Sequence, residues 1–228
     1  MIDWNKYFDH IYVLSRCTNF SQRDIIKQEF DRVNLVNWEF WYNCDNELIN
    51  YGHFTNHILT SQKRCTFGHY SILKTCYELG YDNVLIFEDD TRFLKDINEI
   101  QHQLDIFQQY KNDIDIYCFD YNINNGVIFT ATCWYYNKKG MEYMIYMCEN
   151  NVLQIDNYLY TDFLNNSNIT NQDIIFYINE HKWTINFPKN IQTLNVNISP
   201  TRLCIQYPVA DIYFNSLTQD EIYNLYNI

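Results

Sequence analysis

Three consecutive acids, Glu88, Asp89 and Asp90, follow a run of four apolar residues at positions 84–87. The run is typical of a buried strand, and the acids would stand at its carboxyl end. Because side chains alternate along an extended chain, Glu88 and Asp90 should point to one face and Asp89 to the other. Two carboxylates on one face repel each other unless a cation lies between them. A hard divalent ion, Mn²⁺ or Mg²⁺, would remove that conflict, since such ions prefer oxygen ligands.

A solvated acidic turn is the simpler interpretation of the same triplet. The position of the acids favours a binding site, because open α/β sheets bind their ligands outside the carboxyl ends of strands. From the triplet alone, both interpretations stay open.

The segments around the triplet alternate between strand and helix, which predicts an α/β fold. An apolar run at residues 10–15 predicts a first strand, and a helix capped by Ser21 follows it. The inner face of that helix would carry Ile25, Ile26, Phe30 and Val33. Alternating residues at 37–43 predict a second strand, so the first three elements are typical of a parallel βαβ unit.

Later segments continue the pattern. A helix over residues 67–80 would place Ile72, Cys76 and Leu79 inward and end at Gly80, which suits a left-handed C-terminal position. Further elements are predicted over residues 96–110 (helix), 114–121 and 126–137 (strands), 138–150 (helix) and 216–228 (helix). Residues 172–188 read as a short helix or strand leading into an apolar stretch.

Composition excludes some partners. The formal net charge is −12 and no Lys/Arg cluster occurs, so we expect no nucleic acid partner. The eight cysteines include no C-x-x-C pair and are expected to be buried, reduced thiols, not zinc ligands. We expect a cytoplasmic protein, because the chain shows neither a signal peptide nor a transmembrane segment; peripheral association with a membrane stays open.

Five segments in a fixed order resemble the glycosyltransferase family 25 enzymes, which include bacterial lipooligosaccharide galactosyltransferases and collagen galactosyltransferase domains. They are "IYVLS" followed by Arg16 and Arg23, "CTFGHYSILK", "VLIFEDD", "TATCWYYNKKGMEYM" and "QIDNYL", and they span residues 1 to about 160. The resemblance implies a glycosyltransferase A (GT-A) type of α/β fold, with a mixed, mainly parallel central sheet flanked by helices. It implies one domain over residues 1–228, with a nucleotide-sugar part at about 8–125 and an acceptor part at about 126–228.

The resemblance also implies a reaction, in which a hexose, galactose in the first instance, moves with inversion from a UDP-sugar to a glycan or protein hydroxyl. Mn²⁺ or Mg²⁺ would be held by Asp90, Glu88 and His181. Donor contacts would come from Ser15, Arg16, Arg23, His69 and Glu88. The catalytic candidates are Asp89 and Asp156, the latter as the general base that an inverting transfer needs; Asp162 and Asp173 are its rivals. This chain departs from the family pattern at Gly68, where members have Ser, and at Gln154, where they have Pro.

Two other functions stay open at this point. A metal-dependent phosphohydrolase could use the same triplet together with Asp113, Asp115 and Asp120. A carbohydrate- or nucleotide-binding domain without activity would bind UDP and turn nothing over. UDP-sugar turnover that EDTA abolishes would separate the transferase from both.

Overall fold

The computed structural model describes residues 2–43, 60–120, 132–150 and 194–206, together with 122–124, 127–129, 174–178, 181–185, 188, 190 and 191. Its centre is a six-stranded sheet in the order β11-β5-β8-β3-β1-β2. In chain order these strands are β1 (His10–Arg16), β2 (Glu39–Asn43), β3 (Asn83–Glu88), β5 (Ile116–Cys118), β8 (Cys133–Asn137) and β11 (Val196–Ile198). β8 runs antiparallel to both of its neighbours, and the other pairs in the sheet are parallel.

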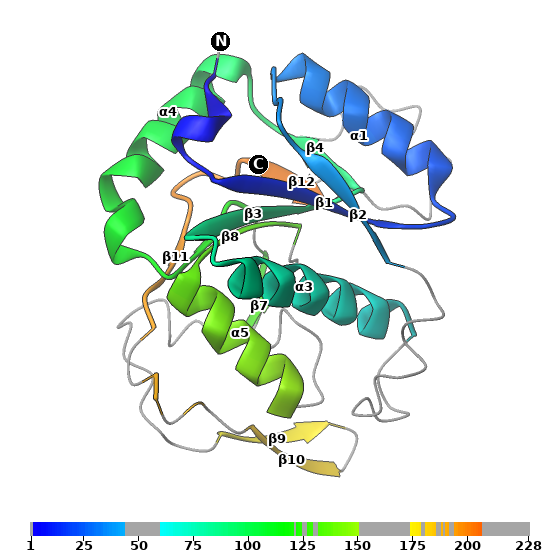
Figure 1. Ribbon diagram of the computed structural model, residues 1–228, viewed down its shortest axis with the longest axis vertical. Helices are drawn as coiled ribbons and strands as arrows, with labels where there is room; N and C mark the ends of the chain where they lie inside the picture. Colours follow the sequence, from blue (N-terminus) through cyan, green and yellow to red (C-terminus); the bar gives the residue numbers. More distant parts are fainter. Residues whose placement is uncertain are drawn as a thin grey trace.

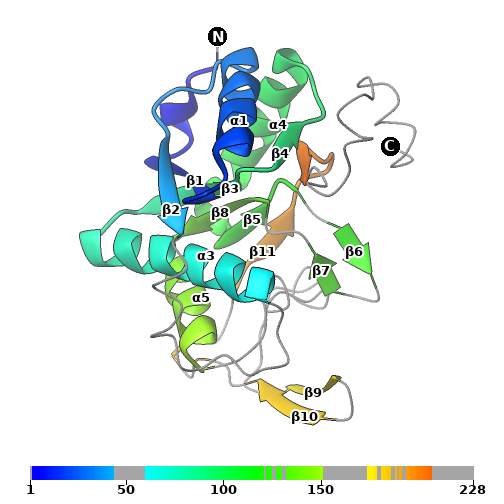
Figure 2. The ribbon, with the colours of Figure 1, turned by 90° about the vertical axis from the view of Figure 1, so that its right-hand side faces the viewer.

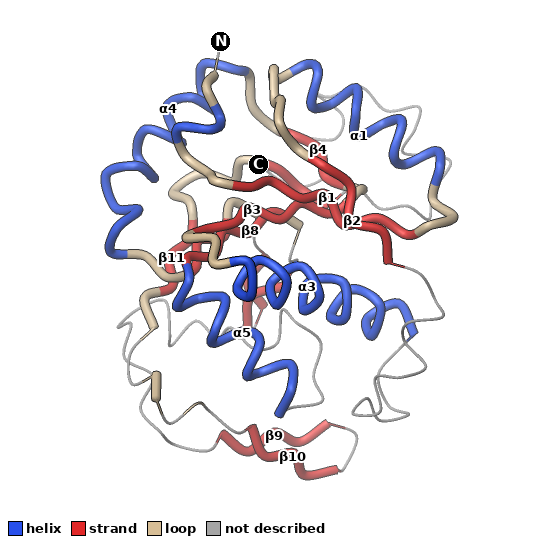
Figure 3. The backbone as a smooth tube through the Cα atoms, in the orientation of Figure 1, coloured by secondary structure: helices blue, strands red, loops and turns tan. Residues whose placement is uncertain are grey.

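Helices cover both faces of this sheet (Figures 1 and 3). α1 (Phe20–Arg32) and α4 (Ile97–Tyr110) lie on one face, and α3 (Thr60–Leu79) and α5 (Lys138–Asn150) lie on the other. The 3-10 turns η1 (Trp4–Lys6) and η2 (Lys111–Asp113) flank β1 and α4. The fold class expected from the sequence, an α/β fold with a mixed, mainly parallel sheet flanked by helices, is confirmed.

Residues 84–87 of β3 are all apolar because both faces of this strand are buried. Val84 and Ile86 pack with α3 and α5 in one core cluster, and Leu85 and Phe87 pack with α1 and α4 in the other. This alternation continues past the end of the strand. Glu88 therefore turns to the α3 face of the sheet, and the next residue turns to the α1 face.

Several predicted boundaries move. α1 begins at Phe20 with Asn19 at its N-cap position, so Ser21 lies inside the first turn instead of capping it. α3 begins at Thr60, seven residues before the predicted start at residue 67, and its Leu79 is exposed, not inward. Gly80 does adopt the left-handed conformation, with φ of 78°.

The segment predicted as one strand at 126–137 holds two strands. β7 (Val127–Phe129) forms a hairpin with β6 (Asn122–Asn124), and β8 enters the central sheet. Residues 174–178 and 181–185 form the hairpin β9 (Ile174–Ile178) and β10 (His181–Ile185). A further small sheet pairs β4 (Thr91–Phe93) with β12 (Cys204–Gln206). The predicted helix at 216–228 lies outside the described residues.

Two general expectations can be compared with the structure. In the described part of the chain, none of the helices has the length and apolarity needed to cross a membrane. Six described cysteines are free thiols, as expected. Cys17 is disulfide-bonded, which corrects the expectation of reduced thiols throughout.

Gly140 allows α5 to start against the sheet. A Cβ atom at this position would lie 2.2 Å from the backbone carbonyl oxygen of Asp115, which cannot move aside as a side chain can. We expect Gly140→Ala to lower the free energy of unfolding by about 1–3 kcal/mol, the usual cost of overpacking. Urea denaturation measures this. Gly80→Ala is the comparison, since nothing lies within 4 Å there and only the left-handed backbone, worth roughly 1 kcal/mol, opposes the change. If both variants lost the same free energy of unfolding, crowding against the Asp115 carbonyl would not be the cause of the loss in Gly140→Ala.

Candidate functional site

The carboxyl ends of β1 and β3 meet at one edge of the sheet (Figure 2). The ladder between them continues one residue past β3, because the backbone N–H of Asp89 donates to the carbonyl of Leu14 at 3.1 Å. The Asp89 carboxylate then accepts from the hydroxyl of Ser15 at 2.6 Å and from the side-chain amide of Asn19 at 3.0 Å. Three polar side chains from two strand ends and one helix start therefore form one hydrogen-bonded junction.

Asn19 was missed by the sequence analysis. An Asn at an N-cap position usually accepts from the first backbone N–H groups of its helix, but this side chain makes no such bond. Its amide donates to Asp89 instead. The sequence did contain a signal for this residue, because Asn19 stands three residues after the end of the strand and directly before the helix. The prediction of Ser21 as the N-cap placed Asn19 outside the helix start.

Burial raises the pKa of Asp89 above its ordinary value, and repulsion from Glu88 adds to the effect. Hydrogen bonds from Ser15 and Asn19 and the charge of Arg16 act in the opposite direction without cancelling it. The junction thus holds a buried carboxylate in one orientation at the edge of the sheet.

Replacing Ser15 with alanine tests the junction. A hydrogen bond to a charged group contributes about 1.5–3 kcal/mol, so Ser15→Ala should lower the free energy of unfolding by that amount. Ser71→Ala, on α3 beside Trp41 of β2, is a control for loss of a hydroxyl that bonds only neutral groups. Urea denaturation of both variants gives the comparison, and an equal loss in the two would show that Asp89 gains nothing special from Ser15.

Glu88 faces α3, as the alternation predicts. Its Oε1 atom accepts from the Cys65 thiol at 2.8 Å and lies 3.2 Å from Nε2 of His69. Burial alone would raise the pKa of Glu88, but the contacts with His69 and Cys65 and the charge of Arg16 together hold it below the ordinary value. The His69 side chain is completely buried. Glu88 and Asp89 therefore serve different partners on opposite faces of the sheet.

Gly68 explains how α3 comes so close. A Cβ atom here would lie 2.4 Å from Cδ1 of Leu14 on β1. The glycine lets the helix rest on the end of β1, one residue before His69. The Leu14 side chain therefore leaves no room for a side chain at position 68, where the family that this chain resembles has Ser.

The two arginines have different surroundings. The Arg16 side chain is exposed at the end of β1, and its charge acts on both Glu88 and Asp89. Arg23 is largely buried and donates to the carbonyls of Arg16 and Cys17, at 2.8 and 3.3 Å. Its guanidinium also lies over the rings of Phe20 and Tyr42. Arg16 is accessible to solvent, while Arg23 fixes the loop that carries it.

Asp90 stands in the turn between β3 and β4 and is mostly buried. The turn is fixed by Thr91, whose hydroxyl donates to the carbonyl of Glu88 at 2.7 Å and to that of Thr132 at 3.1 Å. Asp89 and Asp90 offer carboxylate oxygens only, a donor set that suits Mn²⁺ or Mg²⁺. The chemistry of these two side chains therefore fits the expected ion.

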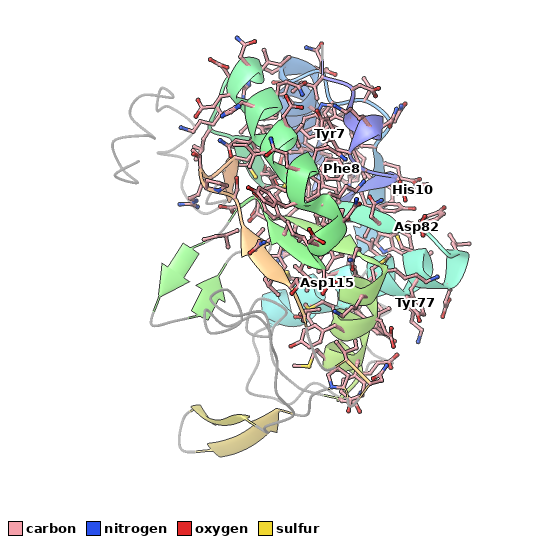
Figure 4. All side chains as sticks on the ribbon, turned by 90° about the vertical axis from the view of Figure 1, so that its left-hand side faces the viewer. Tyr7, Phe8, His10, Tyr77, Asp82 and Asp115 are labelled. Atoms are coloured by element: carbon pink, nitrogen blue, oxygen red, sulfur yellow. The ribbon has the colours of Figure 1, made fainter. Side chains whose placement is uncertain are left out.

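The acids needed for a phosphohydrolase lie elsewhere. Asp115 precedes β5, so it belongs to the amino-terminal edge of the parallel strands, the edge that also carries His10 and Asp82 (Figure 4). Its carboxylate accepts from Lys139, from the side chain of Asn137 and from a backbone N–H. Asp113 is exposed near that edge. Neither residue can join the triplet, which stands at the opposite edge.

Asp120 is at the carboxyl end of β5, on the same edge of the sheet as the triplet. It is completely buried, and its Oδ1 atom accepts from Nε and Nη2 of Arg202 at 3.1 and 2.8 Å. This carboxylate is bound to a cation of the protein itself.

Three predicted site residues lie outside the part of the chain that the structure describes, and a fourth is described in its backbone alone. Asp156 and its rivals Asp162 and Asp173 lie in the segment between α5 and β9. His181 begins β10, and its side chain is not among those described. Their roles stay predictions.

No family model matches the chain, and no curated protein does either. Among solved structures, a glycosyltransferase involved in glycosylation of the major capsid of PBCV-1 is similar over 61% of this chain and 65% of its own, with 9% identity and a TM-score of 0.38. This chain therefore spans less than two thirds of that structure.

Two nucleotidyl-sugar enzymes are similar at the same level. A CMP:2-keto-3-deoxy-manno-octonic acid synthetase complexed with CTP matches over 58% of this chain and 75% of its own, with 8% identity and a TM-score of 0.31. A protein from Bacillus anthracis described as a glucose-1-phosphate thymidylyltransferase matches over 68% and 81%, with 13% identity and a TM-score of 0.34. At these scores the likenesses carry no argument about activity.

Proposed function

We propose that this chain is a metal-dependent glycosyltransferase that moves a hexose from a UDP-sugar to a glycan or protein hydroxyl. The observation that carries the proposal is the junction of Ser15, Asn19 and Asp89 at the shared carboxyl end of β1 and β3. Ligands of α/β sheets bind at such an edge. Galactose as the hexose and inversion of configuration rest on the resemblance to glycosyltransferase family 25.

The residues at this edge of the sheet have separate roles in the proposed reaction. Asp89 and Asp90 would hold the divalent ion, which when bound neutralises charge on the leaving diphosphate. Ser15 and Asn19 orient Asp89. Arg16, exposed and next to the acids, would pair with phosphate oxygens, because its planar fork matches their geometry.

His69 and Glu88 fit the proposal less directly. Both are turned toward α3 and contact each other, so they support the acidic turn from behind. We assign the donor contacts to the side that carries Ser15, Asn19 and Arg16. Asp156 remains our candidate for the general base that takes the proton of the acceptor hydroxyl.

A binding screen tests this function. The full chain is heated with UDP, UDP-galactose, UDP-glucose or a GDP-sugar, each with and without Mn²⁺, and the unfolding temperature is measured. We expect stabilisation by UDP and UDP-sugars only when Mn²⁺ is present, because binding to the folded state alone raises stability. Donor hydrolysis that EDTA abolishes would show that the bound sugar is activated.

Two results would overturn the proposal. Absence of any UDP binding would exclude a UDP-sugar enzyme. Mn²⁺-dependent UDP binding with no turnover across a panel of acceptors would indicate a nucleotide-binding domain instead.

A further inference from the structure

Cys65, His69 and Glu88 bring one sulfur, one nitrogen and one oxygen atom to a single point. The three atoms all lie within 4.8 Å of one another, and two of the separations are 2.8 and 3.2 Å. His69 is completely buried, whereas Cys65 and Glu88 are partly accessible to solvent. An ion could therefore reach the cluster from one side and find a rigid imidazole on the other.

The backbone fixes these side chains independently of any ion. Cys65 and His69 are four residues apart on α3, which places them on the same face of the helix. Glu88 is the last residue of β3, and Gly68 allows the helix to lie close to the strands. Sites carried by helices and strands hold their geometry better than sites on loops.

The separations are close to those of a tetrahedral metal site. Zinc bonds of about 2.0–2.3 Å place neighbouring ligand atoms roughly 3.3–3.6 Å apart. The two pairs that now form hydrogen bonds would need to open by less than about 1 Å, and the sulfur of Cys65 and the nitrogen of His69, within 4.8 Å of each other, would close by up to about 1.3 Å. Binding would replace those hydrogen bonds and release the proton of the Cys65 thiol, because the thiolate is the ligand.

The donor set selects the kind of ion. Thiolate and imidazole favour Zn²⁺ and similar transition metals, whereas Mn²⁺ and Mg²⁺ favour oxygen ligands alone. We propose that Cys65, His69 and Glu88 form a binding site for Zn²⁺ or a chemically similar divalent ion, separate from the donor site at Asp89 and Asp90. Three protein ligands are the number that catalytic zinc sites use, with a fourth position left for water or substrate.

The ion would tie α3 to the end of β3. Glu88 is followed directly by Asp89 and Asp90, so a metal bound to Glu88 would restrict the turn that carries both. The zinc-class site needs neither UDP nor Mn²⁺, and it stands or falls without the proposed glycosyl transfer.

Co²⁺ is a spectroscopic probe for the proposed site, because its absorption bands depend on its ligands. The full chain, without a tag and stripped of metal, is titrated with Co²⁺. We expect a thiolate-to-cobalt charge-transfer band in the near ultraviolet and tetrahedral bands in the visible, both complete at one equivalent and both removed by Zn²⁺. Cys65→Ser should lose the charge-transfer band. Cys148→Ala, which removes a buried thiol on α5, should keep it.

Three further measurements make the outcome decisive. His69→Gln should weaken Zn²⁺ binding by more than the roughly 10- to 100-fold that loss of an outer-shell partner typically causes. Zn²⁺ should protect Cys65 of the unaltered chain from alkylation, read by mass spectrometry, which needs no variant to fold. Asp90→Ala should keep the cobalt band while losing UDP binding.

The proposal fails if the unaltered chain shows no thiolate band and Zn²⁺ leaves Cys65 alkylation unchanged. It also fails if the band survives in Cys65→Ser, or if Asp90→Ala removes it, since the cobalt would then lie at the donor site. Absence of UDP binding by the unaltered chain would count against the proposed transferase and not against the zinc-class site.

Discussion

Replacing Asp90 with alanine is expected to abolish Mn²⁺-dependent binding of UDP while the chain still folds. Asp90 follows a buried strand and lies in a turn that the Thr91 hydroxyl fixes through the carbonyls of Glu88 and Thr132, so the fold should persist. A hard ion that loses a carboxylate ligand binds at least roughly 100-fold more weakly. Isothermal titration with UDP at saturating Mn²⁺ measures the effect.

The matched control for this variant is Asp113→Ala. Asp113 is also an acid beside a strand of the sheet, but it is exposed and lies near the amino-terminal edge. Its loss should change UDP affinity by less than about threefold, because charges farther apart than a Debye length of roughly 8 Å are screened. Undiminished metal-dependent binding in Asp90→Ala would show that the triplet does not hold the ion.

Replacing Arg202 with leucine is expected to cost about 3–5 kcal/mol of unfolding free energy. The arginine donates twice to the completely buried carboxylate of Asp120, and its removal leaves that charge without this cation. The loss should appear in urea denaturation as a lower midpoint with an unchanged slope.

Two comparisons identify the cause. The double variant Arg202→Leu with Asp120→Asn should recover most of the loss, since no buried charge remains. Lys27→Ala breaks an ion pair with Asp24 that is exposed at both ends, and it should cost less than about 1 kcal/mol. If the double variant is as unstable as Arg202→Leu, the loss comes from packing and not from the buried charge.

The acidic strand could be predicted from the sequence because its signal is local. A strand buried on both faces must be apolar throughout, and the change from Phe87 to Glu88 marks its end. The period of two residues also gave the correct division of faces, with Glu88 on one side and Asp89 on the other. The parallel pairing of β1 with β2 followed from the helix between them.

The partners of these acids could not be predicted in the same way. Cys65 precedes Glu88 by 23 residues, and their contact depends on how closely α3 lies on the sheet, which Gly68 decides. A cysteine without a second cysteine nearby gives no metal signal in the sequence.

Some strands of three residues were also not predictable from the sequence. β4, β11 and β12 are too short to show a period, and each is defined by a partner far along the chain. The strands at 122–124 and 127–129 form a separate hairpin, and the sequence between Phe129 and Cys133 contains no Gly or Pro that would mark a boundary before β8.

β11 is synthesised long after its partner strand β5, and this order affects folding during translation. β11 pairs with β5, which lies 80 residues earlier in register from Ile198 to Cys118. Ribosomes add roughly 5–20 residues each second, so β5 would wait about 4–16 s for its edge partner. During that time an unpaired parallel edge offers backbone groups to other nascent chains, and Asp120 has not yet met Arg202. A chaperone that shields β5 on the ribosome would therefore raise the yield of folded protein.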